Sequence, residues 1–312
     1  MKEVFEHFSV MGEEAPRELV INPDGLYVDG TFGRGGHSRR ILKMLSEKGR
    51  LIAFDRDPEA IEAAKQIDDP RFEIIHAPFS HMKQALNERG IERVDGIFLD
   101  IGVSSPQIDD AERGFSFRMD GPLDMRMDTS CGMTAAQWLA QEDEGAIARV
   151  ISELGEERFA RQIARAICKV RQTQPILTTK ALAALVASVV PVNKKDPTQN
   201  PATRTFQAIR IHINGELDEL TQALEAAMDL LSDGARIAII SFHSLEDRIV
   251  KRFYDRAAHP EKSIDPRLPL RADQLPQPDL IHVRRILPSK HECEINARSR
   301  SAILRVATRV RH

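Results

Sequence analysis

Short apolar runs alternate with helical patterns between residues 26 and 100. The apolar runs cover 26–30, 51–55, 72–77 and 94–100, and helical patterns begin near Ser38, at Pro58 and near residue 81. Strands that are almost continuously apolar and are separated by helices are typical of a parallel sheet with both faces covered. This part of the chain therefore predicts a βαβαβαβ arrangement.

The alternation stops at about Arg113, and as far as Thr203 the chain contains a loop and helical patterns only. A long helix is then predicted from Arg204 to Leu231, because apolar residues recur at spacings of three and four. A fifth strand (235–241), a helix (244–254) and a strand of period two (301–310) follow. We expect an α/β fold with a mostly parallel sheet, an antiparallel edge strand and an inserted all-helical domain. The predicted domains are 1–112 with 204–312, and 113–203.

Two predicted helices of the insertion have clear signals. Thr178 is expected to cap a helix that ends before Pro191. The helix from Glu156 to Arg171 separates an apolar stripe from a basic stripe. The basic stripe consists of Arg158, Arg161, Arg165 and Lys169. We expect the apolar stripe to pack, whereas the basic stripe is either a solvated surface or a contact for phosphate groups.

Composition excludes several classes of protein. Of 312 residues, 42% are hydrophobic and 29% charged, which fits neither a disordered nor a fibrous chain. The most apolar stretch, 181–190, is too short for a bilayer span, and the start of the chain lacks a secretory pattern. Three separated cysteines support neither a disulfide framework nor a zinc site. We expect a cytoplasmic protein, and the sequence predicts no oligomeric state.

The net charge of −3 conceals a basic segment near the end of the chain. Residues 284–312 contain eight Lys or Arg residues and only two Glu residues. Such a segment either forms a solvated strand face or contacts nucleic-acid phosphates.

A glycine-rich loop follows the first predicted strand. It reads Asp-Gly-Thr-Phe-Gly-Arg-Gly-Gly-His over 29–37 and leads directly into a helix. Glycines let a backbone approach a ligand closely, and a helix N-terminus offers free N–H groups. The second strand ends in Asp55, whose carboxylate is suited to both hydroxyls of a ribose. Phe79 after the third strand is either an adenine contact or a buried core residue, and the glycine loop and Asp55 predict a site for an adenosine-containing ligand.

The fourth strand ends in Asp100 and is followed by Ser104, Ser105 and Pro106. Exocyclic amino methyltransferases for nucleic-acid bases have a short Ser/Asp/Asn-Pro-rich loop at this place, which the segment resembles. An amine conjugated with its ring is a poor nucleophile, so acceptors must hold its N–H bonds in line with the methyl group. Methylation at cytosine C5 would need a thiolate, but this loop contains no cysteine. A turn without chemistry is the alternative.

Two further segments combine polar residues. Aspartates at 120, 124 and 128 suggest a cation site, but the intervening Gly-Pro and Arg126 favour a salt-bridged loop. After the fifth strand, Ser244 and Asp247 resemble a capping box. His243 is left at the carboxyl edge of the sheet, as either a substrate contact or a structural histidine.

Seven ordered motifs closely resemble the bacterial 16S ribosomal RNA cytosine-N4 methyltransferase family. They are DGTFGRGGHS, FDRDP, DIGVSSPQ, RGFSF, DGPLDMRMD, NPATRTFQAIRI and SFHSLEDRIVKRF, between residues 29 and 253. The resemblance implies a class I (Rossmann-like) methyltransferase fold with a helical insertion. It also implies S-adenosylmethionine as methyl donor and a decoding-region (P-site) cytosine of 16S rRNA, within the small ribosomal subunit, as acceptor.

The residue predictions follow from the motifs together with the resemblance. The predicted cofactor residues are Gly33, Gly35, Gly36, His37, Asp55, Phe79, Asp100 and Gln107. The predicted catalytic residues are Asp100, Ser104, Ser105, Pro106 and His243. The predicted RNA contacts are Arg113, Arg158, Arg161, Arg165 and Lys169, and no metal is predicted. The alternatives are an NAD-dependent Rossmann oxidoreductase and a non-catalytic ribosome assembly factor.

Overall fold

The computed structural model describes residues 9–191, 200–265, 267–268, 271 and 274–312. The chain forms two compact units, one made of residues 1–102 and 217–312 and the other of residues 103–216. The second unit thus begins ten residues before the predicted insertion and extends to Glu216. The predicted domain bounds remain a hypothesis about which residues form the substrate-recognition part.

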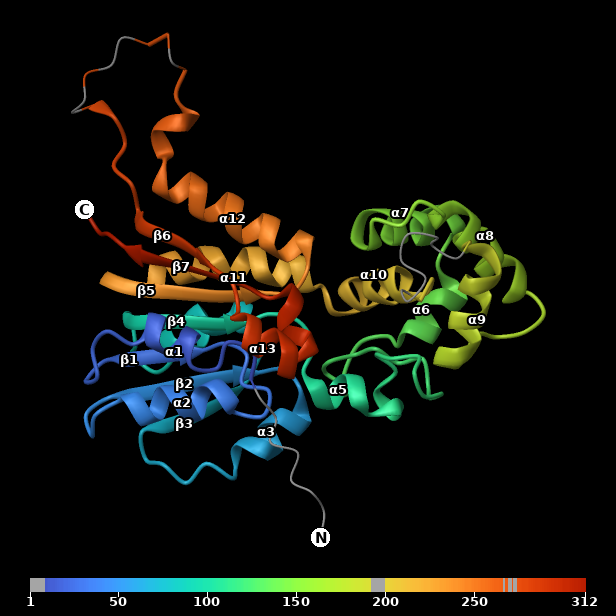
Figure 1. Cartoon of the computed structure of the whole chain (residues 1–312), viewed down its shortest axis with the longest axis horizontal. Helices are drawn as coiled ribbons and strands as arrows, with labels where there is room; N and C mark the ends of the chain where they lie inside the picture. The colour runs from blue at the N-terminus through green and yellow to red at the C-terminus, as the bar shows by residue number, and fades with distance from the viewer. Residues whose placement is uncertain (1–8, 192–199, 266, 269–270, 272–273) are drawn as a thin grey trace. The chain divides into compact units, whose positions relative to one another are not determined.

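The first unit contains a seven-stranded sheet with strand order β3-β2-β1-β4-β5-β7-β6 (Figure 1). The strands are β1 Leu26–Asp29, β2 Arg50–Asp55, β3 Phe72–His76, β4 Val94–Asp100, β5 Leu231–Ser241, β6 Leu280–Ile286 and β7 Ile303–Arg309. Neighbours among β1 to β5 are parallel, whereas β7 is antiparallel to both β5 and β6. The structure therefore confirms the prediction of a mostly parallel sheet that has an antiparallel strand towards one edge.

The antiparallel strand lies second from the edge, because β6 occupies the edge itself. Both faces of β7 are buried, with Leu304 and Val306 on one face and Arg305 and Ala307 on the other. Strand β6 was not predicted from the sequence. Only its first residue, Leu280, is fully buried, so β6 lacks the apolar alternation that would reveal it.

Helices cover both faces of the sheet. On one face lie α4 Met82–Asn87, α11 Glu216–Leu230 and α12 Ser244–Ala258, which share a core cluster with inward residues of the strands. On the other face lie α1 Glu14–Leu19, α2 Gly36–Met44 and α3 Pro58–Ala64. The chain then completes the unit with η1 Phe79–His81, η3 Pro260–Ser263, α13 Lys290–Ile295 and η5 Ala297–Ser301. The two-layered covering fits the parallel sheet expected from the continuous apolar strands.

The predicted helix from Arg204 to Leu231 is wrong in one respect, because the chain forms two helices there. Helix α10 (Thr203–Asn214) ends at Gly215, whose φ of +60° places it in the left-handed region, and α11 begins at Glu216. A glycine adopts this conformation without the steric penalty of a side chain, which makes it a common helix stop. The helical spacing of apolar residues continues through the break and conceals it.

The second unit is helical, as expected. Its elements are α5 Ser105–Asp109, η2 Ala111–Arg113, α6 Ala135–Gln141, α7 Glu144–Gly155, α8 Ala160–Val170, α9 Thr179–Val189 and α10. Helices α6 to α10 contribute to a core that includes Trp138, Ile151, Ile167 and Phe206. Thr178 caps α9 by accepting a hydrogen bond from the N–H of Ala181, as predicted.

Within the described part of the chain, every helix is too short or too polar to traverse a lipid bilayer.

Candidate functional site

Three aspartates stand at the carboxyl ends of neighbouring parallel strands. Asp29 ends β1, Asp55 ends β2 and Asp100 ends β4, and β1 pairs with both other strands. Ligands of open α/β sheets bind at this edge. The sheet therefore brings together the glycine loop, Asp55 and Asp100, as the sequence predicts.

The glycine loop contacts the end of β2 directly. The N–H of Gly33 donates to one Asp55 carboxylate oxygen at 2.7 Å, and the N–H of Asp57 donates to the other at 2.8 Å. Enclosure of the Asp55 carboxyl group raises its pKa to about 6, although these two hydrogen bonds act in the opposite direction. Gly35 caps α2 with a φ of +76°. A side chain there would be strained, and its Cβ would lie 2.7 Å from the Phe32 ring.

A hydrogen-bond network behind the loop was missed by sequence reasoning. Asp29 is fully buried and accepts hydrogen bonds from the Ser38 hydroxyl at 2.5 Å and from the Thr31 N–H at 3.0 Å. The Thr31 hydroxyl in turn accepts a hydrogen bond from the N–H of Asp100 at 2.6 Å. The network joins β1, α2 and β4. All four residues lie in the quoted motifs, but only the three-dimensional structure reveals which of them are bonded.

His37 and Asp100 lie side by side at this edge. The distance between His37 Nε2 and an Asp100 carboxylate oxygen is 3.4 Å, and the His37 ring packs on Phe98 at 4.5 Å between centroids. Phe79, in η1, is half-buried and lies near β1, since a Cβ on Gly30 would be 3.0 Å from Phe79 Cβ. These predicted cofactor residues therefore surround the carboxyl ends of β1 and β4.

Ser104 and Gln107 form a capping box at the start of α5. The Ser104 N–H donates to the Gln107 side-chain oxygen at 2.9 Å, and the Gln107 N–H donates to the Ser104 hydroxyl at 3.5 Å. Ser105 is buried, and Pro106 occupies the first turn, where its missing N–H is tolerated. The box fixes the segment that follows β4. The catalytic and cofactor roles of these residues stay predictions.

The capping box proposed for Ser244 and Asp247 is wrong. His243 caps α12 instead, with Glu246 as its partner, whose carboxylate lies 2.8 Å from His243 Nε2 and accepts the Phe242 N–H at 2.9 Å. Asp247 binds Arg305 through two hydrogen bonds of 2.7 and 3.0 Å. The box escaped prediction because histidine is not among the usual capping residues. A catalytic role for His243 stays a prediction, and Glu246 constrains its ring.

The predicted RNA contacts divide into two groups. Arg113 is buried and donates to the carbonyl oxygens of Arg126 and Met127 at 3.2 and 2.9 Å, so its burial argues against contact with RNA. The stripe Arg158, Arg161, Arg165 and Lys169 is exposed on and just before α8. Ile163 and Ile167 on the opposite side of this helix are fully buried. The predicted separation of an apolar and a basic face is therefore present.

Much of the basic charge after residue 283 is compensated. Arg284 pairs with Glu18, Arg305 with Asp247 and Arg309 with Asp279. The remaining exposed cations include Arg285, Lys290 and Arg300. The α8 stripe is also partly paired, because Arg165 lies 3.7 Å from Glu144, so it is the regular spacing of the stripe that makes it the stronger candidate for phosphate binding.

The aspartate-rich loop is salt-bridged. Asp124 binds Arg126 through hydrogen bonds of 2.8 Å to each carboxylate oxygen. In the described ranges, no group of three or more His, Cys, Asp or Glu side chains is arranged to hold a metal ion.

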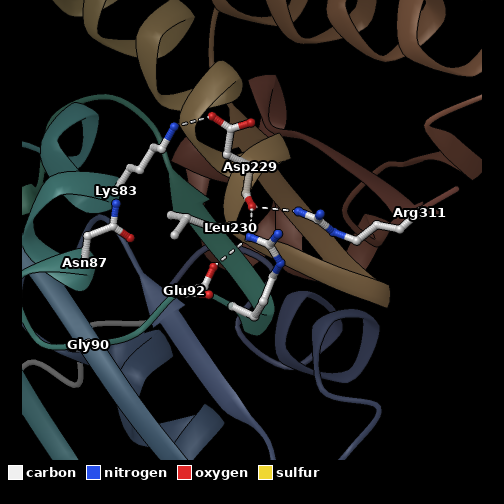
Figure 2. Close-up of a pocket in the computed structure, with 8 residues that line it drawn as sticks. Lys83, Asn87, Gly90, Glu92, Asp229, Leu230 and Arg311 are labelled. Atoms are coloured by element: carbon white, nitrogen blue, oxygen red, sulfur yellow. Dashed lines mark hydrogen bonds and ion pairs between the residues drawn. The ribbon is translucent and has the colours of Figure 1, made fainter.

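A cavity of about 430 Å³ lies at the amino ends of strands β4 and β5 (Figure 2). It is lined by residues before β4 and β5, including Lys83, Glu92 and Asp229, and by Arg311 after β7. Arg93 and Arg311 donate to the Asp229 carbonyl at 2.6 and 2.7 Å, and Lys83 pairs with the Asp229 carboxylate. The two arginine hydrogen bonds satisfy the carbonyl group of Asp229, which lies in the last turn of α11, where carbonyl groups have no partner within the helix. The cavity is therefore accounted for by helix capping and lies away from the three aspartates.

Comparison with known proteins shows the family to which the chain belongs. Ribosomal RNA small subunit methyltransferase H of Ralstonia pickettii (strain 12D) is 58% identical to the chain over 310 residues, which cover 97% of each protein. The protein of the same name from Nitrosospira multiformis is 52% identical over 314 residues, or 99% of each. Residues 4–310 match the MraW methylase family. The chain therefore belongs to the MraW methylase family.

Proposed function

We propose that the protein transfers a methyl group from S-adenosylmethionine to the exocyclic N4 amine of a decoding-region cytosine in 16S rRNA. The observation that carries this proposal is the identity of 58%, over 97% of both chains, with a relative named ribosomal RNA small subunit methyltransferase H. Neither an NAD-dependent oxidoreductase nor a non-catalytic assembly factor receives comparable support.

The residues at the carboxyl edge fit the proposed cofactor. Among the described residues, His37 Nδ1 and one Asp100 carboxylate oxygen are buried without a hydrogen-bond partner. Buried polar atoms normally have partners, so both point to a bound polar ligand. The left-handed Gly33 leaves open space where a side chain would stand. The N-terminus of α2 offers N–H groups for a carboxylate, and Asp55 retains lone pairs for ribose hydroxyls.

When bound, S-adenosylmethionine supplies a methyl group on a positively charged sulfur. The chain must then hold the cytosine amine in line with that carbon. Asp100 has a carboxylate oxygen available for an amine N–H. Acceptors that are already oriented do not have to reorganise during the reaction. Such preorganisation is the largest contribution to the rate enhancement in many enzymes.

The substrate is ribosomal RNA. We propose further that the protein acts on this RNA within the small ribosomal subunit and in the cytoplasm, where ribosomes are found. The α8 stripe supports an RNA phosphate contact. Arg161, Arg165 and Lys169 recur every four residues, which corresponds to a rise of about 6 Å per step along a helix. A row of exposed cations can follow a phosphate backbone while the target base is extruded from its stack.

The proposal is tested by incubating the protein with methyl-labelled S-adenosylmethionine and one of three substrates. These are free 16S rRNA, a partly assembled subunit and the complete 30S subunit, each lacking the modification. Digestion to nucleosides should place the label on cytosine N4 with at least one substrate. Label on cytosine C5 or on a ribose oxygen would refute the amine assignment.

The stripe is tested separately with Arg161→Ala/Arg165→Ala. Loss of two phosphate contacts should weaken RNA binding and reduce the slope of log K against log salt by about 1.4–1.8. The control is Lys251→Ala/Arg252→Ala, which removes the same charge from exposed positions of α12. If both variants change the salt dependence equally, the stripe is ordinary surface.

A further inference from the structure

His37 is buried in a way that calls for a polar partner. It is the second residue of α2, has an exposed fraction of 5%, and packs its ring on Phe98. Over the described part of the chain, neither ring nitrogen forms a hydrogen bond. Leaving such a group unpaired destabilises a protein by about 1–3 kcal/mol, so packing alone does not explain a histidine here.

The charged group facing His37 is Asp100. Phe98 and Asp100 are two residues apart on β4, so their side chains point to the same face of the sheet. His37 therefore covers both, with its ring on Phe98 and Nε2 at 3.4 Å from the Asp100 carboxylate. Hydrogen bonds in sites without ligand are often long and tighten when the ligand binds.

The backbone around Asp100 is already fixed. Its N–H donates to the Thr31 hydroxyl at 2.6 Å, and Thr31 is held by buried Asp29, which also binds Ser38. Because the backbone is fixed, rotation about the side-chain bonds is the freedom that the Asp100 carboxylate retains. A contact between His37 and the nearer carboxylate oxygen of Asp100 is then enough to set the direction of the other oxygen.

Charge supports the same pairing. Two carboxylates, Asp29 and Asp100, stand on adjacent strands next to one imidazole. Burial raises the pKa of Asp29, and Asp100 contributes in the same direction, whereas Ser38 and His37 act in the opposite direction. The His37 ring thus lies where it interacts with the carboxylates at this edge.

We propose that His37 is a positioning residue that binds one oxygen of Asp100 and thereby aims the other oxygen at the N–H of the target amine. The inference rests on the proposed function, because it assigns the role of Asp100 in that reaction. This positioning role differs from a role in which His37 does nothing but contact the cofactor. A cofactor contact changes the affinity for S-adenosylmethionine, whereas a positioning residue changes the rate once both substrates are bound.

Two substitutions separate these roles. His37→Phe keeps a ring on Phe98 but removes both nitrogens, and His37→Gln keeps an N–H donor near the position of Nε2. With saturating substrates, His37→Phe should lower kcat about tenfold or more, whereas both variants should weaken the calorimetric Kd for S-adenosylmethionine to a similar extent, because both lack Nδ1. His37→Gln should restore most of kcat. A cooperative thermal transition in each variant shows that it folds.

A double-mutant cycle with Asp100→Asn tests the coupling. If His37 acts through Asp100, the double variant His37→Phe/Asp100→Asn should be no slower than Asp100→Asn alone. The proposal is overturned if the two effects multiply, or if His37→Phe changes only the Kd for S-adenosylmethionine.

The pair can also be observed without any reaction. In the free protein, ¹⁵N resonances of the His37 imidazole should shift in Asp100→Asn and stay unchanged in the charge-matched control Asp68→Asn, which alters an exposed residue. Unchanged resonances in Asp100→Asn would refute the pairing. The proposed function fails by a different result, namely no label on cytosine N4 with the unaltered enzyme, whatever the resonances show.

Discussion

At the scale of single residues, Asp55 differs from the other carboxylates of the site. Both of its oxygens already accept backbone hydrogen bonds, from Gly33 and Asp57, and its pKa is nevertheless raised to about 6 because the group is enclosed. The folded pKa lies above the ordinary value of 3.8. This group therefore stabilises the fold fully below about pH 3.8, and that contribution is lost as the pH rises through about 6. Binding of a ribose by the carboxylate has the opposite pH dependence.

We expect the affinity for S-adenosylmethionine to fall about tenfold between pH 7 and pH 5, because protonation of Asp55 removes an acceptor for the ribose hydroxyls. Calorimetry over this range measures the effect. Asp55→Asn should bind more weakly at pH 7 but show little dependence on pH over the same range. An equal pH dependence in both proteins would assign the titration to another group.

Gly35 and Gly33 provide a matched pair for the loop. Both have positive φ, but only a Cβ at Gly35 would meet the Phe32 ring, whereas the space around Gly33 is open within 4 Å. Gly33→Ala should lose about 1–2 kcal/mol of unfolding free energy from the left-handed backbone alone. Gly35→Ala should lose more, as measured by denaturant unfolding. Equal losses would mean that the Phe32 ring moves aside without cost.

At the scale of elements, the start of α12 depends on a buried carboxylate. Glu246 is fully buried and accepts hydrogen bonds from the N–H groups of Phe242 and His243, besides its contact with the His243 ring. These contacts fix the turn between β5 and α12 at the carboxyl edge of the sheet.

Glu246→Ala should therefore lower the unfolding free energy by about 2 kcal/mol or more, because two partly buried N–H groups lose their acceptor. His243→Asn should lose less, since asparagine is a favourable capping residue. Lys251→Ala, at an exposed position of the same helix, is the control. If Glu246→Ala is as stable as the control in urea unfolding, the capping box is not significant for the fold.

The elements also show what the sequence reveals and what it conceals. Buried parallel strands were predictable because each is a continuous apolar run, and Thr178 was predictable because threonine is a usual cap. Strand β6 is an edge strand with mostly exposed side chains, so no periodicity marks it. The bonds among Asp29, Thr31 and Asp100 join separate strands, and single-residue signals do not contain such pairings.

At the scale of the whole molecule, each unit has a hydrophobic core of its own. The cluster around Ile97, Leu224 and Ile239 belongs to the first unit, and the cluster around Trp138 and Ile163 belongs to the second. Separate cores allow separate unfolding transitions, in which case a two-state description does not apply.

The single tryptophan, Trp138, lies in the second core and makes this testable. S-adenosylmethionine should raise the midpoint of the circular dichroism transition, to which the sheet contributes, more than that of the tryptophan fluorescence transition. Both midpoints are measured in one thermal series with and without the cofactor. Equal shifts would mean that the two units unfold together.

The position of β7 between β5 and β6 has a consequence for synthesis. Ser241 of β5 and Ile303 of β7 are 62 residues apart in the chain. A nascent polypeptide thus exposes one unpaired backbone edge of β5 until the ribosome has added those residues, and open edges invite aggregation. Chaperone dependence or insolubility of chains that stop before residue 303 would follow from this order of assembly.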